Sequence, residues 1–293
     1  MKQLILNADD FGLTRGVNEG IIRAHREGIL TSATLMANAL AFDHAVELAR
    51  ANPSLGVGCH LVLVGGTAVA PRDEISTLAD RDGQLPASLA AFVTRLSLGS
   101  IRRRDIEREL LAQIEKIRRA GIEPTHLDTH KHTHAHPGVM AALGRVARQT
   151  KIIRVRKPVE NLRDSWRSVP ANGGEMLARL AAAAAVRAIS PWFEALSRRY
   201  GLFSPENFLG LAATGQLGPA LLCRLIDTLP DGCTEIMLHP GLCDAELART
   251  DSRLQEQRQL EMEALLSPEV RRAVTQAGVQ LINYRDFGEC KQA

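Results

Sequence analysis

The chain contains 293 residues, of which 45% are hydrophobic and 24% charged, and its formal net charge is +3. These values are ordinary for a soluble globular protein. The small charge argues against a nucleic-acid partner, because the basic residues are dispersed and their two local clusters, at 102–104 and 271–272, are typical of solvated helix faces.

Strand-like and helix-like segments alternate along the chain. The apolar runs predict strands at 2–8, 32–38, 54–63, 125–128, 152–156, 207–213, 233–238 and 279–284. Periodicity, caps and breakers predict helices at 15–27, 41–51, 105–120, 137–149, 172–200 and 216–229, and two more within 252–277. The stretch from 64 to 86 is rich in Gly, Pro and Asp and is typical of a long loop.

This alternation indicates parallel strands joined by crossover helices. We therefore expect an α/β fold, an irregular (β/α) TIM-like barrel, in a single domain over residues 1–293. An open doubly wound sheet is the structural alternative, but no G-x-G-x-x-G motif follows the first strand. Residues 160–216 read as a variable, mainly helical, insert-like region of that domain.

Cysteine usage and the apolar segments favour a cytoplasmic protein. The five cysteines form no C-x-x-C pair, which is simplest to understand in a reducing compartment. An acidic pair interrupts the N-terminal run MKQLILNADD where a signal peptide would continue its apolar core. The alanine-rich run at 176–186 is shorter than the roughly 18 residues expected of a membrane-spanning helix.

Acidic or histidine motifs accompany four of the predicted strands at their ends. Asp9 and Asp10 follow the first strand, His60 lies near the end of the third, a histidine run follows the fourth, and His239 follows the strand at 233–238. Strand ends of an α/β barrel converge on one face, where active sites are built. Carboxylates and imidazoles brought together there can bind one divalent metal and leave groups for acid–base work. The sequence therefore predicts a metal-dependent hydrolase.

The acidic pair divides naturally into two roles. Adjacent residues on a strand point to opposite sides, so Asp9 and Asp10 can reach one site only where the strand is ending. One carboxylate would then bind the metal while the other is held beside it as a base. Alone, such a pair more often starts a turn or helix, and the other motifs shift the interpretation toward function.

His60 and His239 are weaker signals when each is taken alone. A lone histidine is more often a core or surface residue than a ligand. His60 stands in G-V-G-C-H-L, where the small residues Gly56, Gly58 and Cys59 let other groups approach closely. His239 stands in M-L-H-P-G, and the proline fixes the turn that follows.

The histidine run between 126 and 136 is the most specific signal, since it holds five of the nine histidines. A solvated metal-scavenging tract is the alternative, but the run lies between a strand and a helix rather than at a terminus. The period of two places His126, Asp128 and His130 on one side if the strand extends that far. His132 and His134 would lie in the following loop, where they could contact a substrate or hold the metal ligands in place.

Four segments together resemble the YdjC-like carbohydrate deacetylases, which include the chitooligosaccharide deacetylases. They are N-A-D-D-F-G-L-T (7–14), G-C-H-L-V-L (58–63), T-H-L-D-T-H-K-H-T-H (125–134) and E-I-M-L-H-P-G (235–241), in family order across nearly the whole chain. The resemblance implies an irregular (β/α) barrel that holds a divalent metal and removes acetyl from N-acetylglucosamine units. A homodimer would be unsurprising for this family.

Carried over residue by residue, the resemblance implies that Asp10, His60 and His130 bind the metal. Asp9 would be the general base, and His239 the general acid or its positioning partner. One carboxylate and two imidazoles suit zinc or another transition metal better than magnesium, and the sequence leaves the choice between magnesium and zinc open.

The remaining candidates surround this ligand set. His132 and His134 match family positions that line the pocket. Arg154 and Arg156, on the predicted strand at 152–156, could orient Asp9 or contact the sugar. A structural pairing of each arginine with a buried carboxylate is an equal alternative.

The variable region from 160 to 216 resembles the family branch associated with hopanoid biosynthesis. We therefore expect the N-acetylated amino sugar to be lipid-linked, as in N-acetylglucosaminyl hopanoid, with diacetylchitobiose as the alternative substrate. A helix near 176–189, followed by Trp192 and Phe193, could then contact a membrane surface peripherally. We favour an ordinary packed helix there, because alanine is the best helix former.

Two rival functions remain at this point. A two-metal phosphoesterase or amidohydrolase would need more bridging carboxylates than Asp9, Asp10 and Asp128. A non-catalytic sugar- or metal-binding protein on the same fold would have no use for a spare base beside the ligands.

Overall fold

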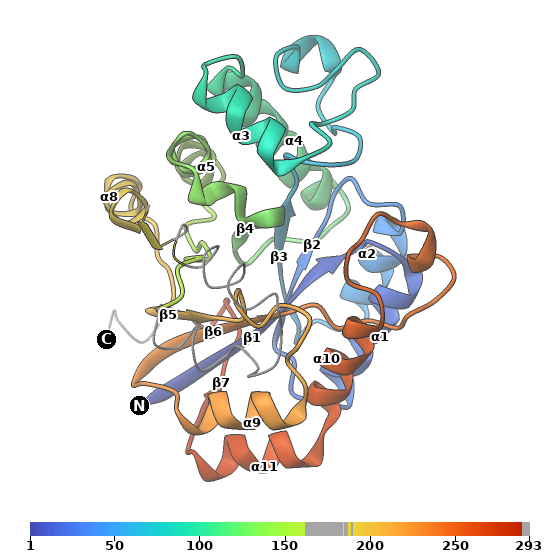
Figure 1. The fold of residues 1–293 in the computed structure, drawn as a ribbon, viewed down its shortest axis with the longest axis vertical. Coiled ribbons are helices and arrows are strands. Elements are labelled where there is room, and N and C mark those ends of the chain that lie inside the picture. Colours follow the sequence, from blue (N-terminus) through green and yellow to red (C-terminus); the bar gives the residue numbers. More distant parts are fainter. Residues whose placement is uncertain (162–183, 185–186, 189, 289–293) are drawn as a thin grey trace.

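A curled parallel β-sheet forms the centre of the structure (Figure 1), a computed structural model that describes residues 1–161, 184, 187–188 and 190–288. Its strands are β1 (Lys2–Phe11), β2 (Ser32–Leu35), β3 (Gly56–Leu61), β4 (Leu127–Thr129), β5 (Asn207–Leu209), β6 (Gly232–Leu238) and β7 (Gln280–Leu281). The strand order is β4-β3-β2-β1-β6-β5, and β7 pairs with the start of β1. All of these pairings are parallel.

Two isolated bridges continue the sheet beyond β4. Leu127 pairs with Val155, and Arg154 pairs with Phe203, four residues before β5 begins at the other edge. The predicted strand at 152–156 is therefore wrong as a regular strand but correct in position. These bridges extend the β4 edge toward the segment that precedes β5, and the sheet curls into a half-barrel. The predicted TIM-like α/β fold in one domain is confirmed.

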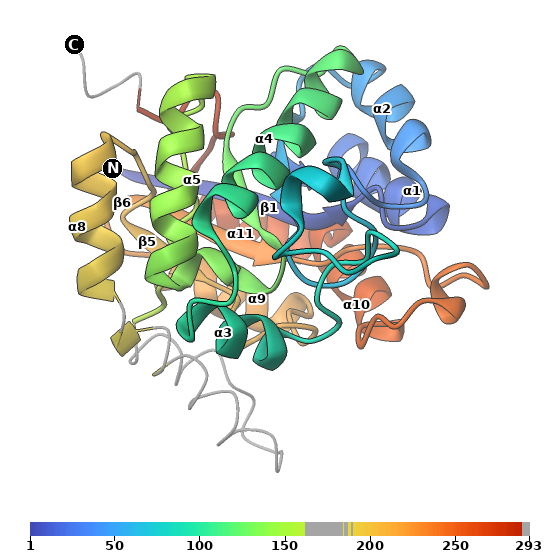
Figure 2. The ribbon, with the colours of Figure 1, turned by 90° about the horizontal axis from the view of Figure 1, so that it is seen from above.

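Helices surround this sheet, as Figures 1 and 2 show. The α-helices are α1 (Arg15–Arg26), α2 (Phe42–Arg50), α3 (Leu89–Ser97), α4 (Arg103–Arg119), α5 (Pro137–Thr150), α8 (Ser190–Tyr200), α9 (Pro219–Asp227), α10 (Glu256–Leu266) and α11 (Pro268–Gln276). Short 3₁₀ helices lie at Arg72–Ile75, His130–Ala135 and Leu247–Arg249. Helix α5 packs between α4 and α8, and α9 packs beside α11.

Local sequence signals explain the main element boundaries. The β1 side chains from Leu4 to Phe11 are all buried, as expected for a parallel strand covered on both faces. The Val17 amide donates to Thr14 Oγ1 at 3.2 Å, so Thr14 caps the N-terminus of α1. Pro137 occupies the first turn of α5, where its missing N–H costs nothing.

Three expectations need correction or lie outside the described residues. Helix α3 follows the predicted loop and was not predicted at all. The loop at 64–86 contains a 3₁₀ turn at 72–75 and buries Ile75 and Leu78, so it packs as part of the core. Of the predicted helix at 172–200, only the part from α8 onward forms a described element, because residues 162–183, 185–186 and 189 of the 160–216 region lie outside the described residues.

The helix considered for peripheral membrane contact, near 176–189, lies mostly outside the described residues, and one of the two aromatic residues that follow it is buried. Trp192 is 63% exposed, but Phe193 is only 3% exposed and its ring packs against the His134 ring at 6.1 Å. Phe193 therefore anchors α8 to the barrel and is unavailable to a bilayer. Among the described residues, no helix is both long and apolar enough to cross a membrane.

The ring of His126 lies so close to Gly58 that no side chain fits at this position. A Cβ atom built there would lie 2.5 Å from Cε1 and Nδ1 of the buried His126 ring, which itself stacks on Tyr284. We expect Gly58→Ala to lower the free energy of unfolding by about 1–3 kcal/mol through overpacking. Urea denaturation measures this, with Gly218→Ala as the control because only a flexible Leu260 side chain lies near that site. Equal losses for the two variants would contradict the assignment.

Candidate metal centre

The Asp9–Asp10 pair lies on a bulge of β1 rather than at its end. The strand continues to Phe11, but its register against β2 shifts between Ala8 and Phe11, and Asp10 has a φ of 64°. This left-handed conformation is uncommon for a residue other than glycine and turns the side chain away from strict alternation. Both carboxylates therefore face one site, for a different reason from the expected strand end.

Three donor atoms from β1, β3 and the turn after β4 converge beside this bulge. Asp10 Oδ1 lies 3.4 Å from His60 Nε2 and 3.4 Å from His130 Nδ1, and the two imidazole nitrogens are 3.2 Å apart. Metal–ligand bonds of 2.0–2.1 Å at tetrahedral angles would separate neighbouring donors by roughly 3.3 Å. Asp10 Oδ1 is also buried without a hydrogen-bond partner. The residues present therefore fit a divalent metal, and they are the same three that the family resemblance implies.

The ring of His60 is held in place from its other nitrogen. His60 Nδ1 lies 2.8 Å from Asp128 Oδ1, and Thr34 Oγ1 donates to Asp128 Oδ2 at 3.1 Å. Such a carboxylate–imidazole pair fixes the ring so that Nε2 points at the metal. Burial alone would lower the pKa of His60, but Asp128 and Asp9 raise it to about 10. The site is thus rich in negative charge and ready to receive a cation.

Arg258 of α10 holds the other oxygen of Asp10, a contact that the sequence analysis missed. Its Nη2 donates to Asp10 Oδ2 at 2.6 Å, and Arg258 is 1% exposed. Burial would raise the pKa of Asp10, but Arg258 and the neighbouring imidazoles hold it well below its usual range. Asp10 is therefore ionised, with Oδ2 occupied and Oδ1 available as a single donor.

Arg156 joins three carboxylates at the centre of the barrel. Its guanidinium donates to both oxygens of Asp9, at 2.8 and 2.6 Å, and its Nη1 lies 2.8 Å from Asp128 Oδ2. Its Nε donates to Glu235 Oε1 at 2.8 Å. Glu235 and Arg156 are both fully buried, and Glu235 was not among the predicted residues. A charged residue inside an apolar strand, as in T-E-I-M-L, was the sequence signal that could have found it.

A second group of donors is less suited to a cation. Asp9, His60 and Asp128 also offer ligand atoms within 4.8 Å of one another. However, the Arg156 guanidinium already lies against both of these carboxylates. A metal placed among these three residues would meet a fixed positive charge, so Asp10, His60 and His130 form the better site.

His239 lies at the end of β6 beside this group. Its backbone amide donates to Glu261 Oε2 at 2.6 Å, while its ring atom Nδ1 is buried without a hydrogen-bond partner. Burial lowers the pKa of His239 to about 4, against the opposing effects of Asp10 and Asp9. The imidazole is therefore neutral at neutral pH and has one nitrogen available for a proton.

The remaining predicted histidines differ in their surroundings. His134 is fully buried, with Nδ1 2.6 Å from Thr129 Oγ1 and Nε2 3.1 Å from the Arg156 carbonyl oxygen. Its ring therefore links the turn after β4 to the segment around Arg156 and is not accessible to a substrate. His132 is partly exposed, packs edge-on against Phe208, and has a buried Nδ1 without a partner. Only His132 of these two can face a bound molecule.

Arg154 does not reach Asp9. It faces the same side of its extended segment as Arg156 but lies two residues nearer the N-terminal end, roughly 6.6 Å along the chain. Its Nε donates to the Phe287 carbonyl oxygen at 2.7 Å. The expectation that Arg154 orients Asp9 is wrong: of the two arginines, Arg156 makes that contact.

The comparison with family models matches residues 3–276 to the model described as YdjC-like protein. The chain belongs to the YdjC-like family. A carbohydrate deacetylase of Geobacillus stearothermophilus is 37% identical over 97% of both chains, and one of Brevibacillus brevis is 33% identical over 98% of this chain and 100% of its own. The similarity to these two named enzymes extends over almost the whole length of each chain. The prediction that this YdjC-like protein is an enzyme is therefore confirmed.

A solved structure supports the same fold. A protein of Enterococcus faecalis V583 assigned to cellobiose-phosphate cleavage superimposes with a TM-score of 0.77 at 26% identity, covering 97% of each chain. The match over nearly the whole length agrees with one continuous domain.

The metal centre of this YdjC-like protein can be tested by binding alone. We expect calorimetry to show about one zinc ion bound per chain. His130→Ala removes a ligand and should abolish tight binding. Arg258→Met frees Asp10 Oδ2 and should weaken binding by about 10- to 100-fold, as expected for a residue that positions a ligand.

Arg103→Met is the matched control, because Arg103 is an exposed residue of α4 that forms an ion pair with Glu107, away from the metal centre. It should bind zinc as tightly as the unaltered protein. Unchanged zinc affinity in both His130→Ala and Arg258→Met would contradict the proposed ligand set.

Proposed function

We propose that this chain is a metal-dependent deacetylase that removes the N-acetyl group from an N-acetylglucosamine unit. The full-length similarity to carbohydrate deacetylases supports the reaction class. The single observation that carries the proposal is the position of Asp9. It lies next to the ligand set, outside the group formed by Asp10, His60 and His130, and Arg156 fixes it there.

Asp10, His60 and His130 would hold the ion in this reaction. One carboxylate and two imidazoles favour zinc or a related transition metal over magnesium, which prefers oxygen ligands. A divalent cation held there supplies polarisation of the acetamide carbonyl and lowers the pKa of water.

Asp9 would accept the proton of the attacking water. Although burial would raise its pKa, Arg156 lowers it, so Asp9 is ionised at neutral pH as a base must be. The paired hydrogen bonds from Arg156 prevent rotation of the carboxylate and keep it facing the site. Since its pKa is low, Asp9 would hold the proton only briefly and pass it on.

His239 would deliver a proton to the departing amine. Its neutral imidazole cannot donate to that amine before it receives a proton itself, because burial holds its pKa near 4. The proton taken from water can supply it, which makes His239 the second member of a relay. His132, partly exposed beside Phe208, would line the sugar side of the site.

The substrate we propose is N-acetylglucosaminyl hopanoid. The support is the resemblance of residues 160–216 to the branch associated with hopanoid biosynthesis. A lipid-linked substrate would require contact with a membrane surface or a carrier, and exposed Trp192 is the aromatic residue available for it on α8. Diacetylchitobiose is the competing substrate. The homodimer and the cytoplasmic location expected from the sequence stay predictions.

Two other functions fit the site less well. A purely sugar- or metal-binding protein would not need Asp9 fixed beside the ligands by a buried guanidinium. A two-metal hydrolase would need a site for a second ion. Among the described residues, the other group of donors is Asp9, His60 and Asp128, which shares His60 with the first group. Arg156 already pairs with both of its carboxylates.

Replacing Asp9 by asparagine separates chemistry from metal binding. Asp9→Asn keeps the shape of the side chain but cannot take up a proton, so we expect turnover to fall by about 100- to 10,000-fold. Zinc content should stay at the level of the unaltered protein. Asp227→Asn, on the exposed side of α9, is the matched control and should change neither quantity. Near-normal turnover in Asp9→Asn would show that another group is the base.

The substrate assignment requires acetate release to be measured on two compounds in parallel. We expect the zinc-loaded protein to release acetate from N-acetylglucosaminyl hopanoid in detergent, and to act poorly on diacetylchitobiose. Release from diacetylchitobiose alone would reject the hopanoid assignment while leaving the deacetylase assignment intact. Release from neither compound would count against both.

A further inference from the structure

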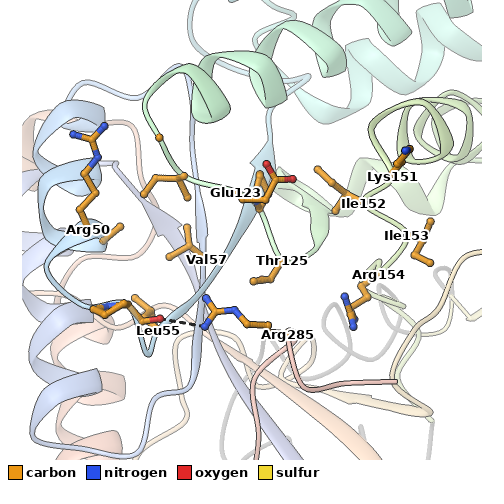
Figure 3. Close-up of a pocket in the computed structure, with 15 residues that line it drawn as sticks. Arg50, Leu55, Val57, Glu123, Thr125, Lys151, Ile152, Ile153, Arg154 and Arg285 are labelled. Atoms are coloured by element: carbon orange, nitrogen blue, oxygen red, sulfur yellow. Dashed lines mark hydrogen bonds between the residues drawn. The ribbon is translucent and has the colours of Figure 1, made fainter. Parts of the chain in front are cut away.

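A second pocket lies at the opposite end of the barrel from the metal centre. Leu55, directly before β3, and Val57 of β3 line this pocket, whereas His60, farther along β3, lies at the metal centre. Thr125, before β4, likewise lines the pocket, whereas His130, directly after β4, lies at the metal centre. The pocket is therefore built around the residues that enter β3 and β4, as Figure 3 shows. The metal centre is built from residues farther along the same strands and after them.

This pocket has the size and lining of a small-molecule site. Its volume is about 610 Å³, within the range of roughly 300–1,000 Å³ that is usual for ligand pockets. Leu55, Val57 and Ile152 give it an apolar floor, and four cationic side chains line it: Arg50, Lys151, Arg154 and Arg285.

Three of these cations are held in place by hydrogen bonds to backbone carbonyl groups. Arg50 donates to the Ala120 carbonyl oxygen at 2.6 Å, and Arg154 donates to that of Phe287 at 2.7 Å. Arg285 donates to the Pro53 carbonyl oxygen at 3.2 Å, the contact drawn in Figure 3. Each guanidinium uses one N–H group in this way and keeps others for a ligand, because arginine carries five.

The positive charge of the pocket is not neutralised within the described part of the chain. None of the four cations forms an ion pair with a described carboxylate. Glu123 also lines the pocket, but Arg118 binds it with both Nε and Nη2. The local charge is therefore strongly positive at a concave surface, where it attracts anions most effectively.

We propose that this pocket binds a phosphorylated small molecule. Planar guanidinium groups match the oxygen geometry of a phosphate group and can bind it through paired hydrogen bonds. The apolar floor would contact the organic part of the same ligand. Because the site is separate from the metal centre, the ligand would be an effector or a second binding partner of the protein and not the acetylated substrate.

The test is calorimetric titration of the zinc-loaded protein with inorganic pyrophosphate at low and high salt. We expect saturable binding that weakens as salt screens the charges. Arg154→Gln and Arg285→Gln should each weaken it by about 10-fold or more, as expected when a charge-assisted hydrogen bond is lost. Lys151→Gln tests the same prediction without breaking one of these hydrogen bonds, because the Lys151 side chain has no ion pair with a described carboxylate.

Two controls separate the pocket from other sources of binding. Arg104→Gln removes the same charge from an exposed position of α4 and should leave the affinity unchanged. His130→Ala should also retain pyrophosphate binding, because the pocket is distinct from the metal centre. Binding that is lost in His130→Ala but kept in the three pocket variants would place pyrophosphate on the metal and overturn the proposal.

A lipid headgroup presents the same phosphate chemistry as a soluble ligand. Sedimentation with vesicles containing phosphatidylglycerol, compared with phosphatidylcholine alone, distinguishes the two sources. Vesicle binding that depends on Arg154 and Arg285 in the absence of pyrophosphate binding would overturn the small-molecule assignment. If neither pyrophosphate nor the vesicles bind at millimolar concentrations of phosphate groups, the proposal that this pocket is a binding site is wrong.

Discussion

The fully buried guanidinium group of Arg156 is the interaction on which the candidate site depends. It contacts Asp9 of β1, Asp128 of β4 and Glu235 of β6, so one cation links three separate strands. Burying a charge without partners is costly, and removing this cation would leave three carboxylates facing one another, a loss of about 3–5 kcal/mol. The arrangement therefore exists only while all four side chains are present together.

This cation organises both halves of the proposed chemistry. Toward β1 it fixes the carboxylate of Asp9, the proposed base. Toward β4 it fixes Asp128, which in turn orients the His60 ring toward the metal. Arg258 makes the equivalent contact on the other side, where it occupies one oxygen of Asp10. Two guanidiniums thus leave Asp10 Oδ1 unpaired beside two imidazole nitrogens, and this donor set fits a divalent cation.

Sequence motifs predicted the donors of this site better than the groups that hold them. Asp10, His60 and His130 stand in short motifs that the sequence pattern assigned to strand ends, and such motifs converge in this fold. Arg258 lies far along the chain on a helix with no recognisable motif, and Glu235 is a single charge in an apolar strand, so neither position could be assigned without the fold. The bulge at Asp10 was equally hidden, since its left-handed backbone occurs at a residue other than glycine.

The elements of the fold were predicted most accurately where the apolar periodicity is strong. They were predicted least accurately where tertiary contacts determine whether a strand forms. The strands of β1 and β6 and the helix α4 have clear apolar patterns and lie where expected. The segment at 152–156 has the composition of a strand, yet only two bridges form, because its partners at β4 and Phe203 are themselves short. Arg154 and Arg156 are alternate residues of this segment and lie at different depths, so one serves the pocket and the other the metal centre.

The position of the bound metal tests this account most directly. Crystals of the zinc-loaded protein, measured on both sides of the zinc absorption edge, would give an anomalous difference peak at the ion. The account predicts one peak per chain, contacted by Asp10 Oδ1, His60 Nε2 and His130 Nδ1, with both Asp9 oxygens still on Arg156. A peak among Asp9, His60 and Asp128, or Asp9 turned onto the metal away from Arg156, would contradict it.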